Sequence, residues 1–237
     1  TGNVTGAQNG AGIGGLLGYG TGVSVQNCYT TGDVIGGSFT AGLVGNGQNV
    51  GIIENCYTKG NVSGGSSGSG VGGLLGLAMN VQNIINCSTT GNVKGRTSVG
   101  GLIGSGYNSP TYKEITNIKN CYTTGDVFGN IITELSRGAL IGSYGSVGNV
   151  SIEGCITTSR VFDERNNEIG YFIGQIEGTP SAEVVVIAKD NFYTHLMTSP
   201  IGKLNNAKIN GTIDKELIAS NLIIAEKNIE SGNVKFY

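Results

Sequence analysis

One pattern recurs six times along this 237-residue chain and limits its possible folds more than any single residue does. Each unit contains an aliphatic or aromatic pair followed by glycine, and it closes with a phrase of the Asn-Cys-Tyr-Thr type. The pairs begin at Leu16, Leu43, Leu74, Leu102, Leu140 and Phe172, and the closing phrases begin at Asn27, Asn55, Asn86, Asn120, Gly154 and Asn191. A unit this short cannot bury its own apolar face, so it must stack on its neighbours. The repeat therefore predicts an elongated array.

The short apolar pieces of each unit have the character of strands. A Thr-Gly-x-Val element places valines at positions 4, 34, 62, 93, 127 and 161, so the period is 28 to 34 residues. This valine, the Gly-Leu-aliphatic-Gly piece and the piece ending in Asn-Cys-Tyr-Thr lack helical length and periodicity. We therefore predict an all-β fold, a parallel β-helix of about six three-strand coils of either hand, with coils ~4.8 Å apart. Leucine-rich repeats and propeller blades fit the pattern less well.

Composition divides the chain into a repeat region and a tail. All but three of the 43 glycines lie at or before Gly178, so the repeat region is predicted to span residues 1–194. Residues 195–237 are predicted to form a non-repeat C-terminal cap or a linker, with a helix starting near residue 214 and a β-like run over 221–225. Because the chain begins within the pattern, at Thr1-Gly2-Asn3-Val4, we expect further domains of a longer polypeptide.

The charge of the chain limits its partners. Only 13% of the residues are charged and the formal net charge is −2, so the chain lacks the basic surface that nucleic acid or an anionic membrane requires. The chain also contains no run of 18 uncharged apolar residues, so we expect neither a transmembrane helix nor a signal peptide.

Cysteine and asparagine each recur at one position of the repeat. The five cysteines share that position, and Phe192 replaces cysteine in the sixth unit, so we predict a column of buried free thiols rather than disulfides or a metal site. An apolar residue stands three positions before each cysteine, so a bend must lie between two inward-facing positions. Asparagine tolerates the left-handed backbone conformation. We therefore predict a corner with a stacked amide ladder formed by Asn27, Asn55, Asn86, Asn120 and Asn191.

Tyrosines in the closing phrase are the candidate ligand-binding residues. If the cysteines face inward, the residues that follow them face outward, which predicts an exposed column of Tyr29, Tyr57, Tyr122 and Tyr193. A row of aromatic rings can stack on sugar rings or form part of a protein-contact face. The alternative is that the rings only stack on one another. Ser88 and Ile156 interrupt the column.

The sequence predicts no catalytic residue, no metal site and no cofactor. The first 113 residues hold only two acids, Asp33 and Glu54, and the single histidine, His195, has no partner motif. A Gly-x-Ser-x-Gly spelling within residues 65–70 belongs to a low-complexity loop. Calcium stays open because Asp33 and Asp126 share a repeat position with Asn3, Asn61 and Asn92, although a role in the corner turns is favoured.

The Gly-Leu-aliphatic-Gly element resembles the GLUG motif, most clearly in Gly73-Leu74-Leu75-Gly76 and Gly101-Leu102-Ile103-Gly104. Such repeats are found in bacterial cell-surface proteins, including adhesin-like exoproteins and the non-catalytic N-terminal parts of IgA-specific metallopeptidases. The resemblance covers roughly residues 1–194 and implies a secreted or wall-attached, extracellular bacterial protein. It brings no catalytic residues with it.

We therefore expect a non-catalytic region that serves as an adhesin stalk or as a binding module. Its partner would be a host protein, a glycan or a polysaccharide, contacted through the Tyr/Thr column and through loops at residues 108–114 and 163–168. Two alternatives stay open, namely a carbohydrate-active β-helix enzyme and an accessory region of a surface metallopeptidase. Catalysis predicts carboxylates that converge in a groove, whereas binding predicts exposed tyrosines in one line.

Overall fold

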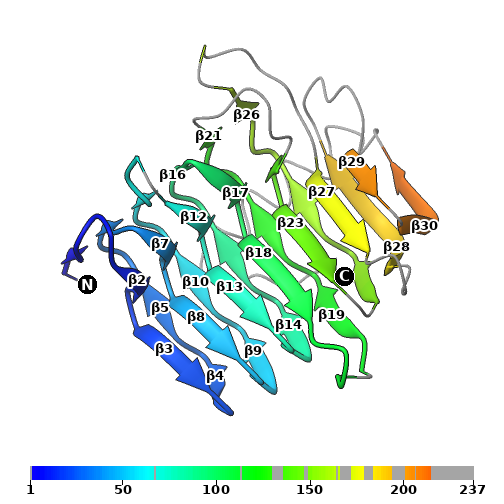
Figure 1. The fold of residues 1–237 in the computed structure, drawn as a ribbon, viewed down its shortest axis with the longest axis horizontal. Coiled ribbons are helices and arrows are strands. Elements are labelled where there is room, and N and C mark those ends of the chain that lie inside the picture. Colours follow the sequence, from blue (N-terminus) through cyan, green and yellow to red (C-terminus); the bar gives the residue numbers. More distant parts are fainter. Residues whose placement is uncertain are drawn as a thin grey trace.

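The computed structural model describes residues 2–66, 68–112, 114–129, 136–146, 149–163, 165, 172–178, 184–193, 201–205 and 207–214. Within these ranges the chain is all-β, its strands pair in parallel, and successive turns lie side by side along one axis (Figure 1). The predicted parallel β-helix is confirmed. Among the described residues it has about five complete turns, followed by strands of a sixth, rather than the six predicted coils.

Two of the four sheets consist of short strands from the first half of each turn. Sheet A contains β1 (Val4–Thr5), β6 (Val34–Ile35), β11 (Val62–Ser63), β16 (Val93–Gly95), β21 (Val127–Gly129) and β26 (Val161–Phe162). Sheet B contains β2 (Ala11–Gly14), β7 (Ser38–Ala41), β12 (Ser69–Gly72), β17 (Thr97–Gly100) and β22 (Arg137–Gly138).

The other two sheets follow in each turn. Sheet C contains β3 (Leu17–Thr21), β8 (Val44–Gln48), β13 (Leu75–Met79), β18 (Ile103–Asn108), β23 (Ile141–Ser146), β27 (Ile173–Gly178) and β29 (Ile201–Asn205). The first row of sheet D contains β4 (Ser24–Gln26), β9 (Ile52–Glu54), β14 (Asn83–Ile85), β19 (Thr116–Lys119) and β24 (Val150–Glu153). Its second row contains β5 (Tyr29–Thr30), β10 (Tyr57–Thr58), β15 (Ser88–Thr89), β20 (Tyr122–Thr123) and β25 (Ile156–Thr157). Both rows pair with β28 (Val184–Tyr193), and β30 (Ala207–Asp214) pairs with β28.

Each turn thus has five strands where the sequence predicted three pieces, because two of the pieces bend. The Asn-Cys-Tyr-Thr piece bends at its asparagine, as predicted. The Gly-Leu-aliphatic-Gly piece bends as well, at Gly73-Leu74 in the third turn, so that β12 and β13 form two arms of a V. The backbones of the arms touch, since a Cβ on Gly72 would overlap the carbonyl oxygen of Leu75. Glycine is required there because no side chain fits between the arms.

The tip of this V reaches across the interior to the opposite wall. Thr58 Oγ1 donates to the carbonyl oxygen of Gly73 at 3.0 Å, and Thr89 Oγ1 donates to that of Gly101 at 2.7 Å. Equivalent bonds join Thr30 to Gly42 and Thr123 to Ala139. The Gly73 and Gly101 carbonyl oxygens also accept from the backbone N–H groups of Gly42 and Gly73, at 3.0 and 3.1 Å. The threonine column therefore supplies a second hydrogen bond to each of these oxygens and ties the V to the opposite wall.

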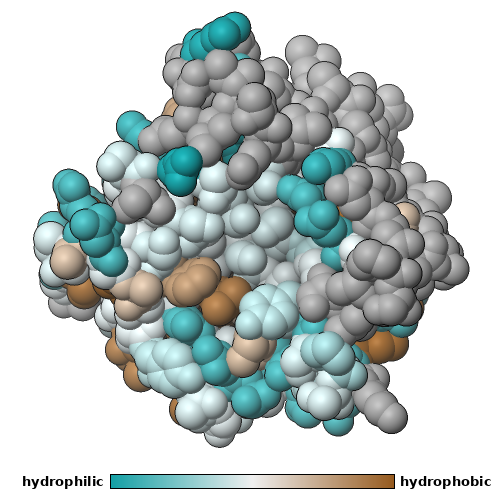
Figure 2. All heavy atoms as spheres, in the orientation of Figure 1, coloured by the Kyte–Doolittle hydropathy of each residue, from teal (hydrophilic) through white to brown (hydrophobic). Residues whose placement is uncertain are grey.

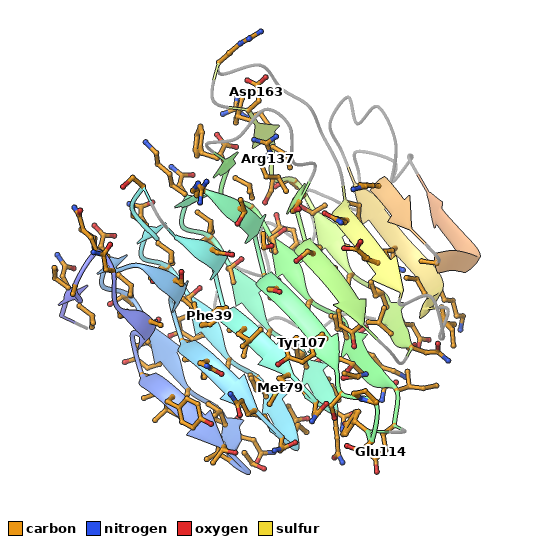
Figure 3. The ribbon with its side chains drawn as sticks, in the orientation of Figure 1. Phe39, Met79, Tyr107, Glu114, Arg137 and Asp163 are labelled. Carbon is orange, nitrogen blue, oxygen red and sulfur yellow. The ribbon has the colours of Figure 1, made fainter. Side chains whose placement is uncertain are left out.

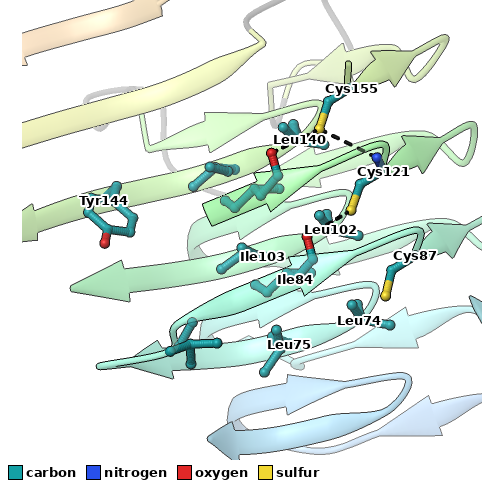
Figure 4. Packing of buried hydrophobic residues seen from close by; sticks show 14 of the residues in the cluster. Leu74, Leu75, Ile84, Cys87, Leu102, Ile103, Cys121, Leu140, Tyr144 and Cys155 are labelled. Atoms are coloured by element: carbon teal, nitrogen blue, oxygen red, sulfur yellow. Dashed lines mark hydrogen bonds between the residues drawn. The ribbon is translucent and has the colours of Figure 1, made fainter. Parts of the chain in front are cut away.

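Columns of equivalent side chains fill the core. The first residue of the aliphatic pair forms one column, the second another, and the cysteines a third (Figure 4). These side chains are fully buried in the middle turns, whereas Leu16 in the first described turn is 46% exposed. Burying each aliphatic side chain contributes about 1.5–3 kcal/mol, so stacking of turns is the main source of stability.

Strands also occur beyond the predicted boundary at residue 194. Strand β29 pairs with β27 and β30 pairs with β28, so both continue existing sheets. The predicted β-like run at 221–225 and all but the first residue of the predicted helix start lie outside the described residues. In the described part of the chain, no helix has the length and apolar character needed to cross a membrane.

Candidate ligand-binding site

The asparagine corner positions the residues that follow it. Asn27, Asn55, Asn86 and Asn120 have φ angles of 54°, 53°, 53° and 51°, which is the left-handed conformation that the sequence predicted. Their amides are linked from turn to turn, with Nδ2 of each residue donating to Oδ1 of the preceding asparagine at 3.2–3.3 Å. Gly154 adopts φ 62° at the same corner of the fifth turn. The ladder is confirmed for these four asparagines.

The prediction for Asn191 was wrong, because the sixth turn has a different register. Strand β28 runs straight through the corner, and Ile156 pairs with Phe192, which places Asn191 opposite Cys155. The Asn191 side chain is buried; its Oδ1 accepts from the Cys155 backbone N–H at 3.0 Å and its Nδ2 donates to the Ile152 carbonyl at 2.7 Å. These two bonds hold the amide inside the core. Asn191, and not Phe192, therefore continues the cysteine column.

Two of the four predicted tyrosines form an exposed pair. Tyr29 and Tyr57 are neighbours in register, and their rings stack with centroids 4.9 Å apart and planes inclined by 7°. Tyr29 is 53% exposed and Tyr57 is 37% exposed. The spacing matches the distance between strands, so the parallel backbone itself sets the stack. We call these two residues the tyrosine pair.

The other two tyrosines do not extend this pair. Ser88 separates Tyr57 from Tyr122 in the register, and Tyr122 is fully buried, which contradicts its predicted exposure. In the last unit Phe192 pairs with Ile156 and Tyr193 pairs with Thr157, so Phe192, and not Tyr193, stands at the register position of the predicted column. The predicted line of four rings is therefore a pair at the N-terminal end of the solenoid.

Polar groups surround the tyrosine pair. The Lys59 ammonium lies 5.6 Å from the centroid of the Tyr57 ring, within the range of a cation–π contact. On the strand that precedes the corner, Gln26 Nε2 donates to Glu54 Oε2 at 2.8 Å. Asn27 and Asn55, which are exposed, stand along the chain between Gln26 or Glu54 and the tyrosine of the same turn. An aromatic platform with amide, carboxylate and ammonium groups beside it is suited to a polar ligand with one apolar face.

The cysteines form the predicted inward column and are free thiols. Cys56, Cys87, Cys121 and Cys155 are buried, whereas Cys28 in the first turn is half-buried. The Cys121 thiol donates to the Lys119 carbonyl at 3.3 Å. Burial, followed by the neighbouring Cys155 and Cys87 thiols, raises the pKa of Cys121 well above its ordinary value. A protonated thiol among aliphatic side chains acts as a small apolar residue.

The Asp/Asn position of Thr-Gly-x-Val bridges adjacent turns. Asp33 Oδ1 accepts from the Asn61 backbone N–H at 2.8 Å, and Asn61 Oδ1 accepts from that of Asn92 at 3.0 Å. The same bond joins Asn3 to Asp33 and Asn92 to Asp126. These oxygens therefore serve the corners, as the sequence favoured. Among the described residues no three His, Cys, Asp or Glu side chains gather as a possible metal site.

Ion pairs occupy the acids of the later turns. Glu153 lies 3.0 Å from Lys119 Nζ and 3.3 Å from Lys189 Nζ, and these two ammonium groups lower the pKa of its carboxyl. Asp126 pairs with Arg160. In the predicted loop at 163–168, Asp163 Oδ1 accepts from the Arg165 backbone N–H at 2.9 Å. The remainder of that loop and His195 lie outside the described residues.

The structure shows a second candidate site that sequence reasoning missed. A groove of about 310 Å³ runs along the outer side of the V, between sheets B and C. Outward side chains of sheet C form one wall, where Ser105, Ser143 and Gln175 follow one another in register. The opposite wall holds Ser98 of strand β17 and Ser136, which directly precedes β22. We call it the serine groove.

Glycine makes the groove concave. A Cβ on Gly76 would lie 2.5 Å from the Gly45 carbonyl oxygen and 2.6 Å from the Phe39 carbonyl carbon, so the arms of neighbouring turns are packed backbone to backbone. Figure 3 shows Phe39, Met79 and Tyr107 on this face of the solenoid, and Figure 2 shows apolar side chains beside a pale hollow there. A signal was present in the sequence, since Ser105 and Ser143 stand at one repeat position, two residues after the aliphatic pair.

Comparisons with known proteins match the repeat pattern. The family model of the GLUG motif matches residues 95–127, which extend from strand β16 into β21 and so cover about one turn of the solenoid. The resemblance predicted from the Gly-Leu-aliphatic-Gly element is thereby confirmed.

One solved structure is similar over most of its length, a crystal structure described as "a putative immunoglobulin A1 protease from Bacteroides ovatus". The TM-score is 0.45 and the sequence identity 13%, with 91% of this chain and 80% of that chain covered. A search of the curated proteins found no match.

Proposed function

We propose that this chain is the non-catalytic repeat region of an extracellular, secreted or wall-attached bacterial surface protein, and that it binds a glycan or polysaccharide of its surroundings. The GLUG motif supports the role of a surface repeat. The observation that carries the binding role is the tyrosine pair, whose two stacked rings are exposed to solvent on adjacent turns. The exposed edges and the outer face of this stack offer an apolar surface that a sugar ring can contact.

The stacked solenoid gives the tyrosine pair a rigid support. Each ring projects from a strand held in register with its neighbour, with Tyr57 N–H donating to the Cys28 carbonyl at 3.1 Å. The preceding corner is fixed by the amide bond between Asn55 and Asn27. Ligand binding therefore costs little conformational entropy in this surface, so a small contact area can be sufficient for binding.

A glycan array tests this proposal with the wild-type protein and a Tyr29→Ala/Tyr57→Ala double variant. The double variant should lose the array signals of the wild type, since contact of a sugar with each ring contributes on the order of 1 kcal/mol to the binding free energy. Tyr19→Ala is the matched control, because Tyr19 is a single exposed tyrosine on strand β3 of sheet C. Equal binding by wild type and the double variant would refute the proposal, as would equal losses in the control.

A further inference from the structure

The serine groove is separate from the tyrosine pair, and its side chains have a different chemistry. We propose that the serine groove binds one ring of a neutral saccharide. The proposal does not rest on the tyrosine pair, because the groove lies between sheets B and C whereas the pair projects from sheet D. Four serine hydroxyls, one amide and one carboxylate line it together with the ring of Tyr107.

The hydroxyls form a connected network across the groove. Ser143 Oγ lies 2.9 Å from Ser98 Oγ and 3.4 Å from Ser105 Oγ, so one hydroxyl joins both walls. Ser136 Oγ donates to Gln175 Oε1 at 2.7 Å, and Gln175 Nε2 donates to Glu177 Oε2 at 3.0 Å. Each hydroxyl offers one donor and two acceptor positions, so these bonds leave capacity for a ligand. Sugar hydroxyls, which both donate and accept, are the matching partners.

One end of the groove is apolar. Tyr107 belongs to the lining, and its hydroxyl is fixed by a contact of 2.7 Å with Met79 Sδ. Beyond the lining, on the side of the third turn, Leu77 precedes Ser105 in the register, and the Phe39 ring lies over Gly70, where a Cβ would meet it at 2.7 Å. A pyranose has C–H faces as well as hydroxyls, so an aromatic and aliphatic end beside a hydroxyl network suits such a ring.

Charge and backbone pairing decide between ligand classes. Among the described residues that line the groove, Glu177 carries the one charge, so an anionic sugar or a phosphate would meet no cation there. A peptide that binds by strand addition needs an unpaired strand edge. Strand β17 pairs with both β12 and β22, and β18 pairs with both β13 and β23, so these two strands offer no such edge.

The size of the groove sets the length of the ligand. Its volume of about 310 Å³ lies at the lower end of the range of roughly 300–1,000 Å³ for small-molecule sites. One sugar ring is therefore the unit that it accommodates, and a longer glycan would continue along the face of the solenoid.

An NMR titration tests the proposal with methyl pyranosides of glucose, galactose, mannose and N-acetylglucosamine. Each probe is added to the labelled chain up to about 20 mM, which detects a millimolar Kd. At least one probe should shift the amide signals of Ser105, Ser143 and Gln175. Ser143→Leu should weaken binding about tenfold or more, because leucine fills the groove and removes a central hydroxyl.

Two further variants separate the groove from other effects. Gln175→Ala removes one amide without filling the groove and should weaken binding severalfold, so it decides the matter if Ser143→Leu fails to fold. Tyr29→Ala/Tyr57→Ala should leave the titration unchanged, which distinguishes the groove from the tyrosine pair. The proposal is overturned if no probe shifts groove signals, if the shifts cluster at the tyrosine pair, or if Gln175→Ala binds as tightly as wild type.

Discussion

Replacing Gly76 by alanine is the sharpest test of how the turns pack. The added Cβ would lie 2.5 Å from the Gly45 carbonyl oxygen and 2.6 Å from the Phe39 carbonyl carbon. Ordinary contacts between carbon atoms are about 3.5–4.0 Å, so one backbone must move by roughly 1 Å. Neither can yield easily, because Gly45 and Phe39 belong to strands held in parallel ladders.

The magnitude follows from two opposing effects. Overpacking of this kind costs about 1–3 kcal/mol, and we expect the upper end because both atoms are backbone. Alanine also restricts the unfolded chain, which returns about 0.4–1 kcal/mol. Gly76→Ala should therefore lower the free energy of unfolding by about 2 kcal/mol, or the Tm by about 4–8 °C for a domain of this size.

Thermal unfolding followed by circular dichroism measures this difference. Gly51→Ala is the matched control, since the nearest atoms to its added Cβ are Ser24 Oγ at 3.6 Å and Gln82 Oε1 at 3.9 Å. Those distances are ordinary contacts, so the control should unfold at the wild-type temperature or slightly above it. If Gly76→Ala and Gly51→Ala unfold at the same temperature, the argument that glycine is needed for close packing of the arms is wrong.

Three other outcomes can be checked on the same protein. Asn86→Ala should lower the free energy of unfolding in urea by about 2 kcal/mol, because alanine is strained at φ 53° and two amide hydrogen bonds are lost. Asn86→Gly should lower it by roughly 1 kcal/mol less, and equal losses in the two variants would contradict the role of φ. Because the pKa of Cys121 is raised in the folded state, the contribution of this thiol to the free energy of unfolding should be complete below the unfolded pKa of about 8.5 and should fall as the pH rises above that value. A free energy of unfolding that stays constant from about pH 7 to 10 would refute this. Cys28, half-buried in the first turn, should react with a thiol reagent before Cys121 does, as mass spectrometry of labelled peptides would show.

The sequence was sufficient for the parts of the fold that depend on local repetition. A left-handed corner at Asn55 or Asn86 needs only the asparagine itself, an apolar residue two positions before it and the cysteine directly after it, so the amide ladder was predictable. The inward cysteines followed from the same spacing. The V at Gly73-Leu74 was not recognised, because two consecutive apolar residues are also typical of a single buried strand. In the structure Leu74 and Leu75 are both buried, but they lie on either side of a bend.

Predictions were wrong where the sequence pattern of a unit differs from the register in which its strands pair. The phrase Asn191-Phe192-Tyr193 is spelled like the earlier units, yet Phe192 pairs with Ile156, so each residue lies one position further along the turn. The cause is the uninterrupted strand β28, which passes the point where earlier turns bend. The predicted exposure of Tyr122 was wrong for a different reason. The alternation of side chains along a strand predicts the direction in which a side chain points, but not which other residues cover it.

The serine groove shows how one residue can serve both stability and binding. The glycine after each aliphatic pair is needed because the arms of adjacent turns touch, as at Gly76. The same close approach leaves a concave corner on the outside, so a groove follows from packing alone. What differs from turn to turn is the residue at this outward position of sheet C, which is Ser105 in the fourth turn and Ser143 in the fifth, both in the wall, and Leu77 in the third turn, beyond the groove. Packing therefore fixes the place of the groove, while these outward positions determine the ligand that it can accept.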